Sequence, residues 1–327
     1  MANWPFRHGV HDLGNGLYGY IQPDGTWGWS NAGLVTSGDE TLLVDTLMSI
    51  PLTQRMLAEF AKVPGGERID RVVNTHANPD HYLGNAAVEG AEVISTYEAL
   101  REMESFNPTA LKNLSANWQN MGDAGEFLFE TMGRQFDFSG ADNLKLPTRT
   151  FERSLTLGVG EKTVELTDLG PAHTGSDTIA WVPQDRVVFT GDLLFNEGHP
   201  IVWNGPFSNW IAACEFIETL EPAIVVPGHG PITDVSAVRN LRGYFEHLRD
   251  EARGRFNAGM SWKDAARDIP MNDYAHWTDP ERVVANVYSL YREWDPLMEA
   301  ATPFMLFGEM NHYRKAHLAS QECGHAH

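Results

Sequence analysis

Histidine and aspartate side chains directly follow short apolar segments at four places in this chain, and this arrangement constrains the fold more than any other feature. Each apolar segment has the composition of a β-strand, and each polar residue falls in a loop marked by Gly or Pro. Segment 68–75 is followed by His76, Asp80 and His81, segment 161–169 by His173, segment 185–190 by Asp192, and segment 223–226 by His229. Loops at strand ends converge on one edge of a sheet, so we expect these side chains to meet.

Imidazoles and carboxylates are the usual protein ligands of zinc and of non-haem iron. Taken singly, the motifs are not specific. His173, in GPAHTGSD, could be an ordinary loop histidine, and the pair at 76–81 could belong to a solvated turn. His229 has glycine on both sides, which permits close approach of the backbone. In combination, and in this order, the motifs predict a metal site.

The remaining pattern alternates between strands and helices. We expect strands within 16–22, 27–37, 40–47, 68–75 and 91–96, with a helix at 51–63. The polar stretch 97–145 has helical periodicity and is interpreted as an insertion. Further strands are expected between 153 and 195 and at 223–230, with a helix at 209–220. Two or three helices follow from 235 to about 300. The tail beyond Thr302 is aromatic and Met-rich and then polar, with several histidines.

Composition excludes some functions. The chain carries 24 basic and 44 acidic residues, and a net charge of −20 disfavours nucleic acid and anionic membrane surfaces as partners. Cys214 and Cys323 are the two cysteines, which argues against a disulfide framework and suits a reducing compartment. The N-terminal residues lack the pattern of a signal peptide, and no apolar run has the length of a membrane span. We therefore expect a cytoplasmic protein.

The motifs THxNxDH at 75–81, GPAHTGSD at 170–177, TGD at 190–192 and PGHG at 227–230 resemble those of the metallo-β-lactamase superfamily and occur in the same order. The resemblance covers about residues 15–235. It implies an α+β fold, the αββα sandwich, in which two sheets lie between helices and the metal site lies at one edge. The core would span 1–235 with a helical insertion at about 97–145. Residues 236–327 would form a C-terminal helical extension and tail packed on that core.

The resemblance also implies the metal ligands. A first site would use His76, the residue at 78 and His173, a second site would use Asp80, His81 and His229, and Asp192 would bridge both. This chain departs from the family pattern at Asn78, where the family has histidine. An amide oxygen is a weaker ligand than imidazole. We therefore expect one tightly bound Zn²⁺ at the second site and a second ion that is weak or absent, with Fe or Mn as alternatives.

Several catalytic roles are compatible with this ligand set. A bound divalent metal lowers the pKa of a coordinated water towards about 7. Asp80 could orient the water or carry a proton, and His76 or His173, if released from the weaker site, could act as a general acid or base. Asp45 ends an apolar strand, and in the resembling family this position lies beneath the metal ligands. It could orient a ligand histidine or simply bond to its own turn.

The segment HPIVWNGPFSNW at 199–210 follows Asp192 closely and should border the site. We expect His199 and Asn209 to contact substrate and Trp203 and Trp210 to line an apolar wall, although Asn209 could instead cap a helix. Such a wall favours a hydrophobic or aromatic substrate.

The leading hypothesis is therefore a metal-dependent hydrolase of an ester, thioester, lactone or aryl–halogen bond. The alternative is a non-hydrolytic cyclase or lyase of secondary metabolism, in which the metal positions an enolisable substrate. A third reading is a binding protein that has lost activity. The apolar periodicity of 283–294 could serve a helix that caps the sandwich or one that joins two subunits, and we favour a homodimer.

Overall fold

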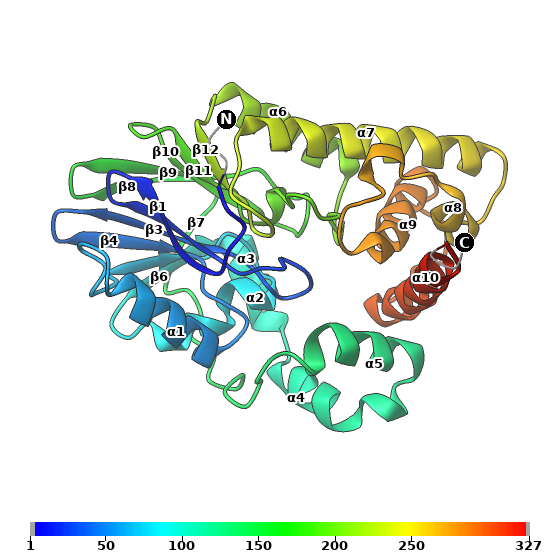
Figure 1. Ribbon diagram of the computed structural model, residues 1–327, viewed down its shortest axis with the longest axis horizontal. Helices are drawn as coiled ribbons and strands as arrows, with labels where there is room; N and C mark the ends of the chain where they lie inside the picture. Colours follow the sequence, from blue (N-terminus) through cyan, green and yellow to red (C-terminus); the bar gives the residue numbers. More distant parts are fainter. Residues whose placement is uncertain (1–3, 325–327) are drawn as a thin grey trace.

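A computed structural model describes residues 4–324, in which two β-sheets lie face to face between layers of helices (Figure 1). The first sheet has seven strands in sequence order, antiparallel from β1 to β4 and parallel from β4 to β7. They are β1 (Gly9–Gly14), β2 (Leu17–Ile21), β3 (Ala32–Ser37), β4 (Glu40–Val44), β5 (Arg71–Val73), β6 (Glu92–Thr96) and β7 (Arg149–Phe151). The sequence pattern predicted neither of the two edge strands, β1 and β7.

The second sheet has five strands in the order β12-β11-β10-β9-β8, antiparallel except for the parallel pair β11 and β12. They are β8 (Ser154–Val159), β9 (Lys162–Asp168), β10 (Thr178–Val182), β11 (Val187–Phe189) and β12 (Ile224–Val226). Apolar side chains of both sheets, such as Val35, Val73, Leu166 and Phe189, form the buried core between them. Their burial provides the main stabilisation of the sandwich.

Helices cover the outer face of each sheet. On the first sheet, α1 (Ile50–Phe60) is capped by Ser49 and buries Leu52, Met56 and Phe60 against it. The second sheet is covered by α6 (Phe207–Thr219) and by the long helix α7 (Val235–Asn257), which is capped by Asp234. The superfamily's αββα arrangement is therefore confirmed.

Most helices of the insertion and of the C-terminal region lie at the same end of the sandwich, on the right of Figure 1. The insertion contains α3 (Tyr97–Ser105), α4 (Pro108–Asn117) and α5 (Gly122–Leu128). The C-terminal group contains α8 (Trp262–Asp268), α9 (Val283–Trp294) and α10 (Pro303–Gly324), and α10 packs on α5. One-turn 3₁₀ or π segments lie at Leu83–Ala87, Trp118–Asn120, Phe129–Gly133, Gly191–Leu193, Asn272–Tyr274 and Pro280–Arg282.

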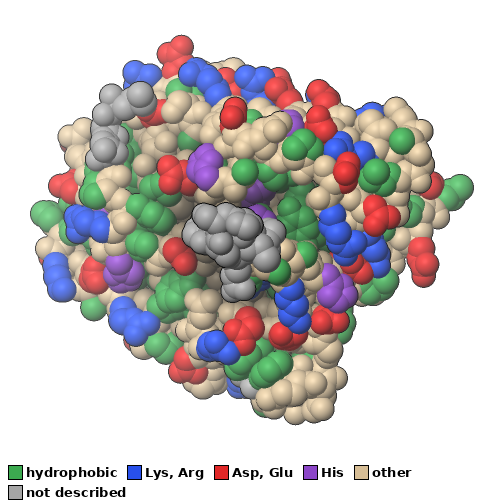
Figure 2. Space-filling view, turned by 45° about the vertical axis from the view of Figure 1, so that its right-hand side comes forward, with side chains coloured by type: hydrophobic (Ala, Val, Ile, Leu, Met, Phe, Trp, Pro, Cys, Tyr) green, Lys and Arg blue, Asp and Glu red, His purple; other side chains and the backbone are tan. Residues whose placement is uncertain are grey.

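The C-terminal region differs from the expected polar tail. Residues 303–324 form helix α10, which carries His312 and His317, whereas His325 and His327 lie outside the described residues. The apolar side of α9, which suggested a dimer, is buried within the chain itself. On the face drawn in Figure 2, acidic and basic side chains are interspersed and do not gather into a patch of one sign. Within residues 4–324, no helix has the length and apolar character needed to cross a bilayer.

Candidate metal centre

The register of the sheets brings the ligand-type residues to one edge. Phe189 of β11 pairs with Val226 of β12, and Asp192 and His229 each lie three residues beyond that pair. His76 lies three residues beyond the end of β5, in the other sheet. Asp80 and His81 belong to the short helix α2 (Pro79–Tyr82) that follows. Loops from both sheets therefore meet at one point.

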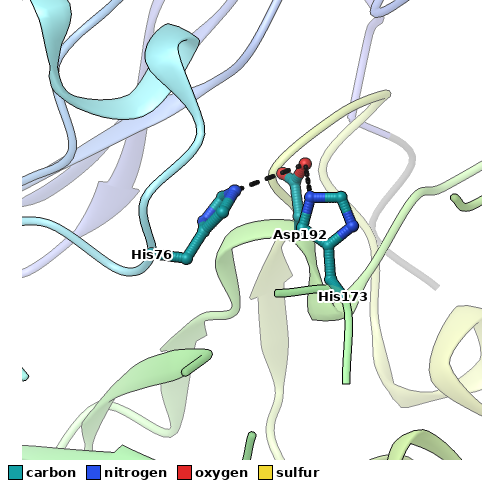
Figure 3. Close-up of side chains that lie close together, drawn as sticks. All are labelled: His76, His173 and Asp192. Carbon is teal, nitrogen blue, oxygen red and sulfur yellow. Dashed lines mark ion pairs between the residues drawn. The ribbon is translucent and has the colours of Figure 1, made fainter. Parts of the chain in front are cut away.

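The first group consists of His76, His173 and Asp192, which point towards one another in Figure 3. Asp192 Oδ2 lies 3.3 Å from His173 Nε2 and 3.7 Å from His76 Nε2. All three side chains are buried. Asp192 can occupy this position because residue 228 is glycine. A Cβ atom at Gly228 would lie 2.0 Å from Asp192 Oδ1.

The second group consists of Asp80, His81 and His229. Asp80 Oδ2 lies 3.3 Å from His229 Nε2 and 3.8 Å from His81 Nε2. Asp192 also reaches this group, since its Oδ1 lies 3.0 Å from His81 Nε2 and its Oδ2 lies 3.4 Å from His229 Nε2. The structure therefore places Asp192 between the two groups, at the position of a bridging ligand.

These residues are better suited to bind a metal ion than to form hydrogen bonds with one another. His76 Nε2, His81 Nε2 and Asp192 Oδ1 are buried and have no hydrogen-bond partner among the described residues. Such atoms are costly to bury unless another group satisfies them. Donor atoms held about 2.0–2.1 Å from a tetrahedral ion lie roughly 3.3–3.4 Å apart, close to the separations observed here. The donor set, imidazole with carboxylate, is typical of zinc and of non-haem iron.

Hydrogen bonds on the far side of each imidazole direct its other nitrogen into the centre. His81 Nδ1 lies 2.9 Å from Asp45 Oδ2, and Asp45 also accepts the backbone N–H and the hydroxyl of Thr75. His229 Nδ1 donates to the carbonyl oxygen of Gly25 at 3.0 Å. Outer contacts of this kind fix the tautomer and the ring orientation of metal ligands. Asp45 thus occupies the supporting position that the resemblance suggested.

Asn78 has the extended backbone that Pro79 imposes, with φ −76° and ψ 139°. Its side chain does not cap helix α2. Instead, Asn78 Nδ2 donates to His173 Nε2 at 2.8 Å, while His173 Nδ1 donates to the carbonyl oxygen of Ile201 at 2.7 Å. The Nε2 lone pair that a metal ion would need is therefore already used by the amide.

The electrostatics divide the histidines into two pairs. Burial lowers the pKa values of His76 and His173 and keeps both rings neutral. Burial also acts against a charge on His81 and His229, but the neighbouring carboxylates, Asp192 first among them, outweigh it. They raise the pKa of His81 well above its usual value and that of His229 to about 9. In the protein without metal, the second group therefore carries the protons.

A cavity of about 670 Å³ opens onto the centre. Asn78, Asp80, His173, Asp192 and His229 form its polar floor, whereas His76 and His81 do not line it. The walls are mostly apolar and come from the early loop, the insertion and α10, with Trp27, Leu111, Leu114, Met132, Phe304 and Phe307 among them. The insertion and the C-terminal helices thus complete a site whose floor belongs to the sandwich.

Four residues of segment 199–210 were expected to face substrate, and for three of them the structure shows that this is wrong. Trp203 lines the cavity, but His199, Asn209 and Trp210 do not. His199 is fully buried beside the Tyr244 hydroxyl at 3.1 Å, and burial lowers its pKa to about 3. Trp210 is a core residue that donates to the Leu193 carbonyl. Asn209 is not the cap of α6 either, because that helix begins at Phe207.

Sequence reasoning missed two charged residues of the cavity wall, Glu102 and Arg282. Glu102 lies on α3 and accepts the backbone N–H of Gly175, in the loop that carries His173. Arg282 lies in the short segment before α9. Neither residue belongs to a motif or stands directly after a strand, so no local signal in the sequence marks it.

Comparison with known proteins agrees with this geometry. The family model described as the metallo-beta-lactamase superfamily matches residues 25–229. A linear primary-alkylsulfatase from Pseudomonas sp. (strain ATCC 19151) is 22% identical over 256 residues, which are 70% of this chain and 47% of that protein. A beta-lactamase-like protein 2 homolog from Caenorhabditis elegans is 29% identical over 83 residues, 25% of this chain and 27% of that protein. The chain therefore matches less than half the length of either relative.

Solved structures show the same fold. The inverting sec-alkylsulfatase Pisa1 from Pseudomonas sp. superposes with a TM-score of 0.64 at 14% identity, over 90% of this chain and 52% of that one. A metallo-beta-lactamase from Pontibacter korlensis gives 0.54 at 18% identity, over 73% of this chain and 99% of that one. The family match spans well over half of the chain, and the chain therefore belongs to the metallo-β-lactamase superfamily, whose sulfatase and β-lactamase members are metal-dependent hydrolases.

Proposed function

We propose that this protein is a metal-dependent hydrolase that acts on a small hydrophobic or aromatic molecule. The observation that carries the proposal is the apolar cavity of about 670 Å³ that opens onto both ligand groups. Cavities of this size and composition hold drug-sized ligands. A binding protein without activity would have no need of six buried ligand residues directed at one point.

We propose Zn²⁺ as the resident ion, bound tightly by Asp80, His81, His229 and Asp192 and only weakly, or not at all, by the first group. The hydrogen bond from Asn78 to His173 supports this difference in affinity. When bound, such an ion supplies a hydroxide-like nucleophile at neutral pH and stabilises negative charge on a leaving group.

The positions of the candidate catalytic residues distinguish their roles. Asp80 and His173 line the cavity and can reach a substrate, whereas His76 is fully buried and does not line it. We therefore assign proton transfer to Asp80 or, once the hydrogen bond from Asn78 is released, to His173, and a purely ligating role to His76. Until that release, Asn78 would hold the His173 ring in place.

The bond that is cleaved remains one of four classes: ester, thioester, lactone or aryl–halogen. Two of the similar proteins are named alkylsulfatases. An alkyl sulfate is an ester of an apolar alcohol, and this favours the ester class. Protein stripped of metal and reloaded with Zn²⁺ should hydrolyse 1-naphthyl acetate faster than a more polar acetate ester. Loss of turnover after chelation, and its return with Zn²⁺, would support the proposal. Turnover that does not depend on metal would overturn it.

We keep a non-hydrolytic cyclase or lyase as the alternative. Reaction in ¹⁸O-labelled water separates the two, because hydrolysis places the label in the product and cyclisation does not. A homodimer and a cytoplasmic location stay proposals. The apolar face of α9 that suggested a dimer is buried within the chain, so the mass of the protein in solution tests the dimer. The cytoplasmic location rests on the sequence features given above.

A further inference from the structure

A buried cation lies in the wall of the cavity. Arg282 is only 2% exposed, and its guanidinium lies over the rings of Trp27 and Phe195, with Cζ 4.5 and 5.1 Å from their centroids. Nη1 donates to the carbonyl oxygen of His199 at 2.9 Å. These contacts hold the side chain in one orientation.

The hydrogen-bonding capacity of Arg282 is not used up. Its Nε has no hydrogen-bond partner among the described residues, although it is buried. Asp279 Oδ2 forms an ion pair with Nη2 at 3.0 Å, yet that oxygen accepts no hydrogen bond within the described part of the chain. Burial raises the pKa of Asp279 to about 7, despite the opposing effect of Arg282. A buried guanidinium is costly unless it is well paired, and here Asp279 provides a counter-charge while the Nε donor stays without a partner in the described part of the chain.

The same wall connects Arg282 to the metal centre. The Phe195 ring stacks on the His229 imidazole at 5.0 Å, with 3° between the planes, and Arg282 lies over that Phe195 ring. Two cationic positions, the guanidinium and a metal ion, would thus face one apolar cavity. Glu102 is the lining carboxylate outside the centre, and it already accepts the Gly175 N–H.

We propose that Arg282 is a specificity-determining residue that binds an oxyanion, a carboxylate or sulfate group, of the substrate. This inference rests on the proposed function and names its substrate class. The substrate is an anionic amphiphile whose apolar body lies along Leu111, Phe304 and Phe307. A guanidinium is suited to this role because its planar donors match the geometry of an oxyanion.

Binding to metal-free protein tests the proposal without any need for turnover. Decanoate, decyl sulfate and decanol share one apolar chain, and calorimetry gives their affinities. We expect at least one of the two anions to bind about tenfold more tightly than decanol, the gain of one charge-assisted hydrogen bond. Equal affinities for all three probes overturn the proposal, whether or not the protein hydrolyses esters.

Variants separate Arg282 from the protonated histidines of the centre. The double variant Arg282→Met/Asp279→Asn removes both charges together and should abolish the preference for anions while retaining decanol binding. Arg253→Gln is the matched control, since Arg253 is an exposed arginine over Phe256 and Trp294 outside the cavity. If the double variant does not fold, Arg282→Lys keeps the charge without the planar fork, and should weaken anion binding several-fold. An unchanged preference in a folded variant overturns the assignment.

Discussion

The Asn78 amide and a metal ion compete for one lone pair on His173. The ring must carry its proton on Nδ1, because the Ile201 carbonyl can only accept, and this leaves Nε2 free to accept from Asn78. An ion in the first group has to break that hydrogen bond to reach His173, and residue 78 offers it no imidazole in return. The second group has no such competitor, and His81 Nε2 and Asp192 Oδ1 have no hydrogen-bond partner among the described residues.

Asn78→His should therefore raise the metal content from about one to about two equivalents per chain, because it adds an imidazole and removes the competing donor. Elemental analysis after dialysis measures the content. Asn209→His, the same substitution on α6, should leave it unchanged. The interpretation is wrong if the wild-type protein already holds two equivalents as tightly as Asn78→His does.

Asp45 supports the centre through His81 and Thr75. Asp45→Asn should weaken metal binding about 10–100-fold, because the His81 ring loses the carboxylate that fixes its tautomer. Competition with a chromophoric chelator measures the affinity. Asp185→Asn alters an aspartate that pairs with Lys162 in the turn between β10 and β11, and should have no effect. An equal loss in both variants would contradict the role given to Asp45.

Metal binding should release protons. The carboxylates raise the pKa values of His81 and His229, so both rings are protonated at pH 7 in the metal-free protein and neutral once a metal binds. We expect the release of about two protons per ion at pH 7 and an apparent affinity that increases from about pH 6 to pH 9. Calorimetry in buffers of different ionisation enthalpy counts the protons. A binding enthalpy independent of the buffer would disprove the prediction.

At the scale of elements, the cavity wall depends on helices that lie outside the shared core. Phe304, in the first turn of α10, lines the cavity although it is 44% exposed. Phe304→Ala should raise KM for 1-naphthyl acetate about tenfold, by the loss of apolar contact area, without a large effect on folding. Its neighbour Met305 is 51% exposed and does not line the cavity, so Met305→Ala is the control. Similar KM values for the two variants would remove α10 from the binding site.

The sequence pattern predicted those elements whose residues carry a local signal. The motifs at strand ends contain the six residues that the structure brings together as two candidate ligand groups, because register and loop length bring strand ends together. The pattern failed where placement depends on tertiary packing. The weak amphipathic character of 303–324 gave no sign that α10 would pack on α5. Arg282 and Phe304 reach the cavity only through that packing, and His199 turned inward to a buried partner at Tyr244.

At the scale of the whole molecule, a metal ion would join the two sheets. His76, Asp80 and His81 follow β5 of the first sheet, whereas His173, Asp192 and His229 follow strands of the second. Asp192 approaches ligands from both sides of this junction. Any ion held there would bind the folded chain far better than the unfolded one, and would stabilise it by mass action.

Removal of metal should therefore lower the melting temperature. A free ion concentration of about a hundred times Kd contributes roughly 2.7 kcal/mol, which corresponds to a decrease of about 4 °C for a chain of this size. Thermal unfolding followed by circular dichroism, with and without chelator, measures the change. Excess Zn²⁺ should restore the original value. A melting temperature that does not respond to chelation would place the ion, if there is one, elsewhere.

The order of the chain has a consequence for biosynthesis. The last metal ligand is His229, whereas the α10 residues that close the cavity begin at Pro303. During translation, every residue of the two ligand groups is therefore made before Pro303. A nascent or truncated chain that ends before Pro303 would already hold every ligand, yet its centre would be open to solvent and to unselected substrates. The cavity that would select a substrate is thus completed only after the whole metal centre has been synthesised.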